Sequence, residues 1–79
     1  MRVIVIEDDA DAAAFVKGVL SEAGHAVDVC GDGESGLNKA RTGDYDALVV
    51  DRMLPGMDGL KLLKSYRDGG GRAPALFLS

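Results

Sequence analysis

The chain has 79 residues, about the size of one small domain, and 47% of them are hydrophobic. Its net charge of −4 argues against direct nucleic-acid contact by this segment, because phosphate binding needs a basic face. No apolar run approaches the roughly 20 residues that span a bilayer, and no signal peptide precedes the first acids, so we expect a cytoplasmic protein without membrane contact. Cys30 is the only cysteine, and we expect it to be a small apolar residue at a strand end rather than a redox group.

The first predicted strand covers residues 3–6, which are β-branched, and three acids, Glu7, Asp8 and Asp9, follow it at once. A helix is predicted over residues 10–23, because apolar residues recur there with the 3.6-residue period of an amphipathic helix. Gly24 ends this helix. The apolar residues expected on its packing arc are Ala12, Ala13, Phe15, Val16, Val19, Leu20 and Ala23.

The middle of the chain predicts a second strand over residues 26–29 and a second helix that runs to about residue 42. Asp32 can cap this helix, which carries only a thin apolar stripe of Leu37 and Ala40. The third strand, residues 47–50, is apolar without periodicity, which is typical of a strand buried on both faces. It ends at Asp51. This acid is therefore expected at the carboxyl end of a core strand.

The last third begins with Pro55 and Gly56, which favour a turn, and with Asp58, which can cap a third helix over residues 59–67. Leu60, Leu62, Leu63 and Tyr66 are available to pack this helix. Three glycines, residues 69–71, make a flexible connection to a fourth strand over residues 75–78. Strands that alternate with helices predict an α/β fold with right-handed crossovers and a parallel sheet.

A doubly wound, flavodoxin-like sheet with the strand order 2-1-3-4 would make the first and third strands neighbours. Their carboxyl ends would bring Glu7, Asp8 and Asp51 together at the topological switch point. Several carboxylates there repel one another, and a hard divalent cation such as Mg²⁺ relieves the repulsion with only one or two carboxylate ligands. A magnesium site is therefore expected at this edge.

Two other interpretations of these motifs remain open at this stage. The acid run Glu7-Asp8-Asp9 can simply cap the first helix and complement its dipole, and residues 54–59 can be an ordinary turn between a strand and a helix. An EF-hand is excluded, because the sequence has no run of alternating aspartates with the required glycine and glutamate. His25 has no histidine or cysteine partner at ligand spacing and is expected at a strand entry.

Taken together, the acid run after the first strand and the stretch from Leu48 to Gly59 resemble the receiver domain of two-component response regulators. The likeness is closest to the winged-helix (OmpR/PhoB-like) branch, and the fold implied is that of the flavodoxin-like (CheY-like) class. The resemblance implies that Asp51 is the phosphoacceptor and that Ser79 is the switch hydroxyl. It also implies that Asp8 and Asp51 bind Mg²⁺ directly, Glu7 through water, and Met53 through its backbone carbonyl.

The resemblance covers residues 1–79, but the family fold continues beyond the position of Ser79. The chain is therefore interpreted as the N-terminal part of a receiver domain (βαβαβαβ), truncated after the fourth strand. A fifth strand with its lysine, a switch aromatic and the last two helices have no counterpart in the sequence. Because that lysine contacts the phosphoryl group in the family, we expect phosphorylation to be impaired.

The function implied by the resemblance is that of a signalling domain, not an enzyme. With Mg²⁺, Asp51 would accept a phosphoryl group from a sensor histidine kinase and regulate an output, transcription in the parent protein. At most, the chain would phosphorylate itself from a small phosphodonor. The alternative is a phosphorylation-impaired module that acts through dimerisation or interaction. A homodimer is expected in either case, or a swapped oligomer hinged at the glycines 69–71.

Overall fold

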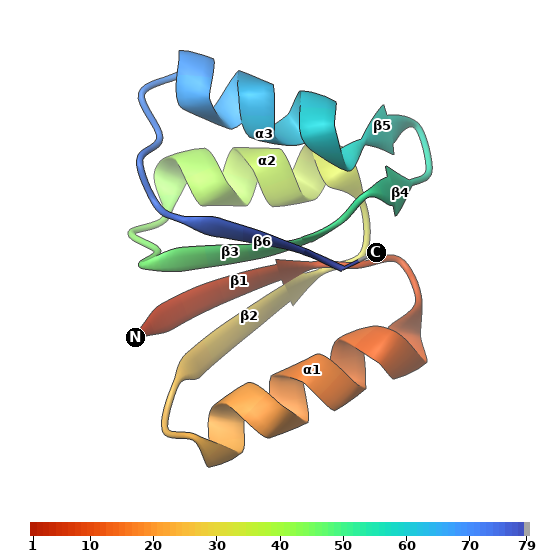
Figure 1. Ribbon diagram of the computed structural model, residues 1–79, viewed down its shortest axis with the longest axis vertical. Coiled ribbons are helices and arrows are strands. Elements are labelled where there is room, and N and C mark those ends of the chain that lie inside the picture. The colour runs from red at the N-terminus through yellow and green to blue at the C-terminus, as the bar shows by residue number, and fades with distance from the viewer. Residues whose placement is uncertain (79) are drawn as a thin grey trace.

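The computed structural model describes residues 1–78, which form a four-stranded parallel sheet covered by helices (Figure 1). The strands are β1 (Arg2–Ile6), β2 (Ala26–Cys30), β3 (Ala47–Asp51) and β6 (Ala75–Leu78). Their order is β2-β1-β3-β6, and all three pairings are parallel. The predicted fold class and strand order are therefore confirmed.

Three helices cover the sheet in the described part of the chain, and an aspartate caps each of them. The helix α1 (Ala10–Glu22) lies on one face, whereas α2 (Gly33–Thr42) and α3 (Gly59–Asp68) lie on the other (Figure 1). The side chains of Asp9, Asp32 and Asp58 accept hydrogen bonds from backbone N–H groups in the first turns of α1, α2 and α3. These bonds satisfy donors that have no partner within a helix. The caps predicted at Asp32 and Asp58 are thus confirmed.

The larger core lies between the sheet and the pair of helices α2 and α3. The side chains of Ile4, Ile6, Leu48 and Val50 point from the sheet into this core and are fully buried, as is Leu62 of α3. Leu37 and Ala40 supply the thin stripe expected of α2. The smaller core under α1 is built around the buried residues Val3, Val5 and Val49.

The helix α1 packs along a narrower stripe than its sequence predicts. Ala13 is buried and Val16 and Leu20 are half-buried, but Phe15 and Val19 are 73% and 53% exposed. The cause is position, because α1 packs on β1 and β2. The edge of its apolar arc therefore extends past the strands that it contacts. Ala23, beyond the last helical residue, is exposed too, so the prediction that Phe15, Val19 and Ala23 pack was wrong.

A short hairpin that was not predicted connects β3 to α3. The strands β4 (Met53–Leu54) and β5 (Met57–Asp58) pair in an antiparallel arrangement around Pro55 and Gly56. Gly56 has a φ of 73°, which only glycine adopts readily and which this turn requires. Within residues 1–78, none of the helices is long and apolar enough to cross a bilayer.

Candidate functional site

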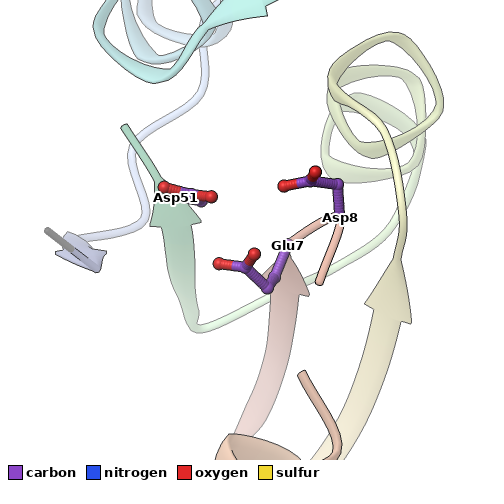
Figure 2. A group of neighbouring side chains, drawn as sticks. All are labelled: Glu7, Asp8 and Asp51. Carbon is purple, nitrogen blue, oxygen red and sulfur yellow. The ribbon is translucent and has the colours of Figure 1, made fainter. Parts of the chain in front are cut away.

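Glu7, Asp8 and Asp51 gather at the carboxyl edge of the sheet (Figure 2). The strands β1 and β3 are paired up to Ile6 and Val50, so the acids that follow these two residues emerge side by side. Each of the three acids offers a carboxylate oxygen, and these oxygens lie within 4.8 Å of one another. The strand order therefore brings together acids that are more than forty positions apart in the sequence.

Backbone N–H groups orient two of these carboxylates. Oε1 of Glu7 accepts a hydrogen bond from the N–H of Asp9 at 2.9 Å, and Oδ1 of Asp51 accepts one from the N–H of Met53 at 3.0 Å. Glu7 is also anchored through its own N–H, which donates to the carbonyl oxygen of Cys30 at 3.0 Å. The acids are thus fixed to the ends of strands β1 and β3 and to the loops that follow them.

Burial raises the pKa of one member of the cluster, Glu7. The residue is only 6% exposed, and this desolvation raises the pKa of the Glu7 carboxyl above its ordinary value of 4.5. The negative charges of Asp51 and Asp8 raise this pKa further, whereas the hydrogen bond from Asp9 lowers it. Within residues 1–78, none of the three acids forms an ion pair with lysine or arginine. The cluster therefore holds negative charge without a cationic side chain to balance it.

The donor set fits a hard divalent cation. Mg²⁺ takes oxygen ligands in an octahedron at about 2.0 to 2.1 Å, which places neighbouring ligand oxygens about 2.9 Å apart and opposite ones about 4.1 Å apart. Oxygens that lie within 4.8 Å of one another need only small side-chain movements to reach these separations. A ligand that stays further out can be bridged by water, as Mg²⁺ usually retains several waters.

The structure separates the roles of the predicted site residues. Asp9 caps α1, with Oδ1 accepting from Asp11 and Ala12 at 2.9 and 3.2 Å. The capping interpretation of the acid run thus holds for its third member. The N–H of Met53 donates to Oδ1 of Asp51, so the Met53 backbone lies beside the acid cluster. Ser79, the expected switch hydroxyl, lies outside the described residues.

Gly59 is a residue of this region whose importance the sequence did not indicate. It is buried at the start of α3, and its N–H donates to the carbonyl oxygen of Arg52 at 3.0 Å. The sequence identified it as part of a helix cap with Asp58 and as the end of the loop after Asp51, but not as a position of close backbone approach. A glycine in the first turn of a helix, where most residues are tolerated, was the available signal that the backbone is closely approached there.

An order of β2-β1-β3-β6 with three carboxylates at its carboxyl edge defines a flavodoxin-like module with a candidate divalent-cation site. The family model described as the response regulator receiver domain matches residues 3–79. The chain belongs to the response regulator receiver family.

Curated relatives carry the same domain in longer proteins. The transcriptional regulatory protein DltR of Streptococcus agalactiae serotype III (strain NEM316) is 39% identical to the chain over 79 residues. The transcriptional regulatory protein QseB of Escherichia coli O157:H7 is 39% identical over the same length. These alignments cover 100% of this chain but 35% and 36% of the two relatives. The chain therefore spans about a third of the length of these relatives.

Solved receiver structures superpose closely on the model. The receiver domain of the Francisella response regulator 1452 has a TM-score of 0.94 at 37% identity, with 99% of this chain and 64% of that chain covered. The chemotaxis response regulator CheY4 of Vibrio cholerae has a TM-score of 0.89 at 27% identity, with 96% and 65% covered. The backbone is therefore that of a receiver domain over the residues described.

Proposed function

We propose that Asp51 accepts a phosphoryl group from a sensor histidine kinase in a step that needs Mg²⁺. The main support is the convergence of three carboxylates within 4.8 Å at one edge of the sheet, in a chain of the receiver family. Asp51 is proposed as the nucleophile because it takes the place of the phosphoacceptor in the receiver resemblance, at the end of strand β3, and is only half-buried. Glu7, by contrast, is buried.

In this proposal Asp8 and Asp51 bind Mg²⁺ directly, Glu7 binds it through a water molecule, and the backbone carbonyl of Met53 is the third protein ligand. The ion, when bound, neutralises charge on the phosphoryl oxygens and relieves the repulsion among the acids. The N–H of Met53 holds Oδ1 of Asp51, so the other carboxylate oxygen is the one that attacks. The hydroxyl of Ser79 would bind one oxygen of the transferred group.

The transfer is a nucleophilic displacement at phosphorus. A new P–O bond forms to the carboxylate of Asp51, while the P–N bond to the kinase histidine breaks. The bonding pair remains on the imidazole nitrogen, which takes up a proton. The product is an aspartyl phosphate, a signalling state rather than the end of a catalytic cycle.

The proposed output is supported by the relatives, which are transcriptional regulators. We propose that phosphorylation changes the surface around β6 and thereby regulates transcription through the parent protein, in the cytoplasm. This segment itself, with its net charge of −4, is not expected to contact DNA.

A second candidate function is that of an interaction module which dimerises without being phosphorylated. It is favoured by the exposed apolar surface of α1 and β6, where Phe15 and Leu76 are 73% and 71% exposed. The two candidates differ in whether Asp51 is needed for association. A homodimer can also accompany phosphorylation, either through β6 or by a swap hinged at the glycines 69–71.

Incubation with acetyl phosphate and Mg²⁺, followed by intact-mass and peptide mass spectrometry, tests the phosphoacceptor proposal. We expect an adduct of one phosphoryl group on Asp51. The adduct should not form when EDTA removes the Mg²⁺, and it should not form in Asp51→Asn. The control variant Asp9→Asn removes a carboxylate from the same acid run but keeps the Oδ1 acceptor of the α1 cap, so it should still be labelled. An adduct that persists in Asp51→Asn, or no adduct in the wild type, would contradict the proposal.

A further inference from the structure

The loop that follows Asp51 returns to its own starting point. Met53 pairs with Asp58 across the β4–β5 hairpin, and the next residue, Gly59, donates its N–H to the carbonyl oxygen of Arg52 at 3.0 Å. The loop is therefore closed at its base, where Gly59 touches the backbone that carries Asp51. The first turn of α3 and the end of β3 meet at this point.

No side chain fits at Gly59. A Cβ atom there would overlap the carbonyl oxygen of Asp51 and would lie 2.9 Å from Cα of Arg52. Both neighbours are backbone atoms, so no change of rotamer can relieve the overlap. The φ angle of Gly59 is not positive, which means that close approach, and not backbone conformation, requires glycine here.

We infer that Gly59 is a positioning residue for Asp51 and Met53, an inference that rests on the function proposed above. The hydrogen bond from the N–H of Met53 to Oδ1 of Asp51 is 3.0 Å long, so the acceptor carboxylate takes its orientation from this loop. A side chain at position 59 must open the base of the loop. It would thereby shift the Asp51 backbone and the Met53 peptide together, while Glu7 and Asp8 keep their places in the loop that follows β1.

The expected consequence is a loss of metal affinity and of phosphorylation rate. Groups that orient metal ligands without touching the metal are commonly worth a factor of about 10 to 100 in affinity or activity. Phosphoryl transfer depends on positioning to a similar degree, because a misplacement of about 1 Å can cost a factor of about a hundred. Gly59→Ala should therefore weaken Mg²⁺ binding at least about tenfold, beyond any effect on stability.

A matched variant separates positioning from general destabilisation. In Gly71→Ala the new Cβ would overlap the ring of Tyr66. Gly71 lies in the loop that precedes β6, at the amino ends of the strands and thus away from the acid cluster at their carboxyl ends. Both variants should melt at a lower temperature than the wild type. Only Gly59→Ala should weaken Mg²⁺ binding, measured from the amide chemical shift of Asp8 during a titration. Unchanged affinity in Gly59→Ala, or an equal loss in Gly71→Ala, would overturn the inference. If the wild type itself bound no Mg²⁺, the proposed function would fail first, and this inference with it.

Hydrogen exchange in the wild type decides the question if Gly59→Ala does not fold. Binding of Mg²⁺ at Asp51 and Met53 should tighten the closed loop and slow exchange of the Gly59 amide. The Gly71 amide donates a hydrogen bond to the carbonyl oxygen of Tyr66 at 2.9 Å. Because it lies at the opposite ends of the strands from the metal site, its exchange reports global stabilisation. We expect the ratio of Gly59 to Gly71 protection to rise several-fold with Mg²⁺. A constant ratio, while the amide shift of Asp8 responds to Mg²⁺, would contradict the inference.

Discussion

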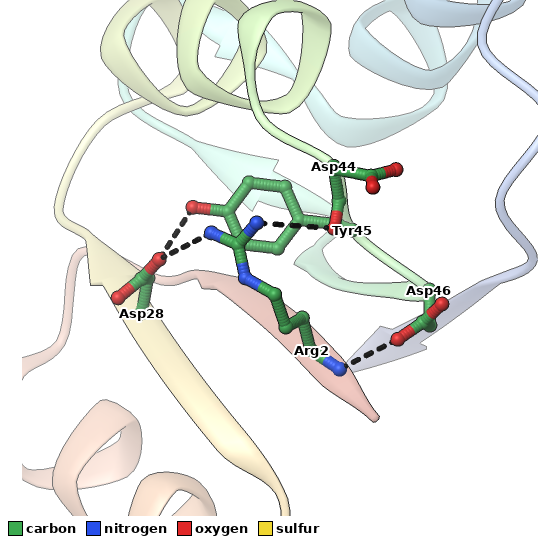
Figure 3. A network of polar contacts seen from close by, with 5 residues as sticks. All are labelled: Arg2, Asp28, Asp44, Tyr45 and Asp46. Atoms are coloured by element: carbon green, nitrogen blue, oxygen red, sulfur yellow. Dashed lines mark hydrogen bonds and ion pairs between the residues drawn. The ribbon is translucent and has the colours of Figure 1, made fainter.

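The hydroxyl of Tyr45 donates a 2.6 Å hydrogen bond to Oδ2 of Asp28 and so ties the loop before β3 to the middle of β2 (Figure 3). Arg2 completes the network, with its guanidinium 4.8 Å from the centre of the Tyr45 ring and 3.8 Å from the Asp28 carboxylate. The same guanidinium donates to the carbonyl oxygen of Asp44, and the backbone N–H of Arg2 donates to Asp46. Three segments of the chain are thus joined beside the sheet.

Tyr45→Phe should lower the free energy of unfolding by about 1 kcal/mol, because it removes one hydrogen bond to a charged group and leaves the packing of the ring in place. The loss lies below the usual range of about 1.5 to 3 kcal/mol for charged partners, since the Asp28 side chain is 42% exposed and water can replace the hydroxyl. For a domain of this size the melting temperature would fall by about 4 to 8 °C. Asp28→Asn combined with Tyr45→Phe gives a double-mutant cycle. A coupling energy near zero would show that the bond contributes nothing.

The contribution of this bond should depend on pH in both directions. The hydrogen bond from Tyr45 holds the pKa of Asp28 below its ordinary value of 3.8. This group therefore stabilises the fold above about pH 4, and the effect is lost as the pH falls through the lowered pKa. Burial, together with the hydrogen bond to Asp28, raises the pKa of Tyr45 from 10.0 to about 12. Its contribution is complete below pH 10 and is lost between about pH 10 and 12.

Urea denaturation of the wild type and Tyr45→Phe from acid to alkaline pH measures this dependence. The difference in unfolding free energy should be largest on the plateau between about pH 4 and 10 and should narrow on both sides. Asp68, which pairs with Lys64 on the exposed surface of α3, supplies a control in Asp68→Asn. A difference between wild type and Tyr45→Phe that stayed constant below about pH 4 and above about pH 10 as well would contradict the assignment.

The fold was predictable because the local amino-acid composition was enough to identify its core strands. The β-branched run 3–6 and the apolar run 47–50 are buried on both faces, and such strands need no partner to be identified. The burial of α1 was less predictable. Its sequence shows a broad apolar arc, but which part of the arc packs depends on where the helix lies over the sheet. Phe15 and Val19 are exposed because that placement is a tertiary property.

The acid cluster was predictable from topology alone, whereas only the turn at Pro55 and Gly56 was predicted in the loop beside it. Once β1 and β3 are neighbours, Glu7 and Asp51 must end at the same edge. The hairpin of β4 and β5 depends on two short pairings that leave no periodicity in the sequence. The contact of Gly59 with the Asp51 backbone is a matter of close approach in space, and no spacing of residue types encodes it. Ser79 and the Met53 carbonyl remain predictions.

Removal of one charge from the cluster should stabilise the protein without metal and abolish its response to metal. Asp51→Asn retains an Oδ1 acceptor for the N–H of Met53 but reduces the repulsion on Glu7 and Asp8. We expect a gain of about 1 kcal/mol without Mg²⁺, the size of one charge interaction at such distances in a solvated site. In the wild type, saturating Mg²⁺ should raise the melting temperature, because a ligand bound only by the native state stabilises it.

Thermal unfolding with and without Mg²⁺ checks this prediction, with Asp8→Ala as a second variant that should lose the response and Asp9→Asn as a control that should keep it. Binding in the millimolar range is expected, since few carboxylates contribute. The idea would be wrong if Mg²⁺ up to tens of millimolar left the wild-type melting temperature unchanged. An equal Mg²⁺ response in Asp8→Ala would be just as damaging.

Two helical glycines should respond to alanine in opposite directions. A Cβ at Gly36 would lie 2.7 Å from Cδ1 and Cγ2 of Ile6, which is fully buried. Overpacking of this kind costs about 1 to 3 kcal/mol. Gly18 lies in the exposed face of α1 with nothing within 4 Å of an added Cβ, so Gly18→Ala should gain up to about 1 kcal/mol from helix propensity. Chemical denaturation of both variants tests the packing of α2 on β1. Similar effects of the two substitutions would show that this packing is looser than described.

The two outer strands of the sheet, β2 and β6, differ in how they are protected from pairing with another chain. β2 carries Asp28, and a charge on an edge strand discourages pairing with another chain. β6 is hydrogen-bonded to β3 on one side, and its residues Ala75–Leu78 are all apolar. Leu76 of this strand is 71% exposed on the same side of the sheet as Phe15 of α1. Such uncovered apolar surface beside an open edge favours a partner.

We therefore predict a homodimer in which β6 and the adjoining surface of α1 pack against a second copy. Leu76→Lys places a charge on this edge and should shift the protein to monomer. Leu60→Lys makes the same change on an exposed residue of α3, on the opposite face of the sheet, and should leave the dimer intact. Light scattering across a wide concentration range, with thermal melting to verify folding, provides the measurement. A cooperatively melting wild-type monomer at every concentration would refute the prediction. Dissociation by both variants alike would instead move the interface away from β6.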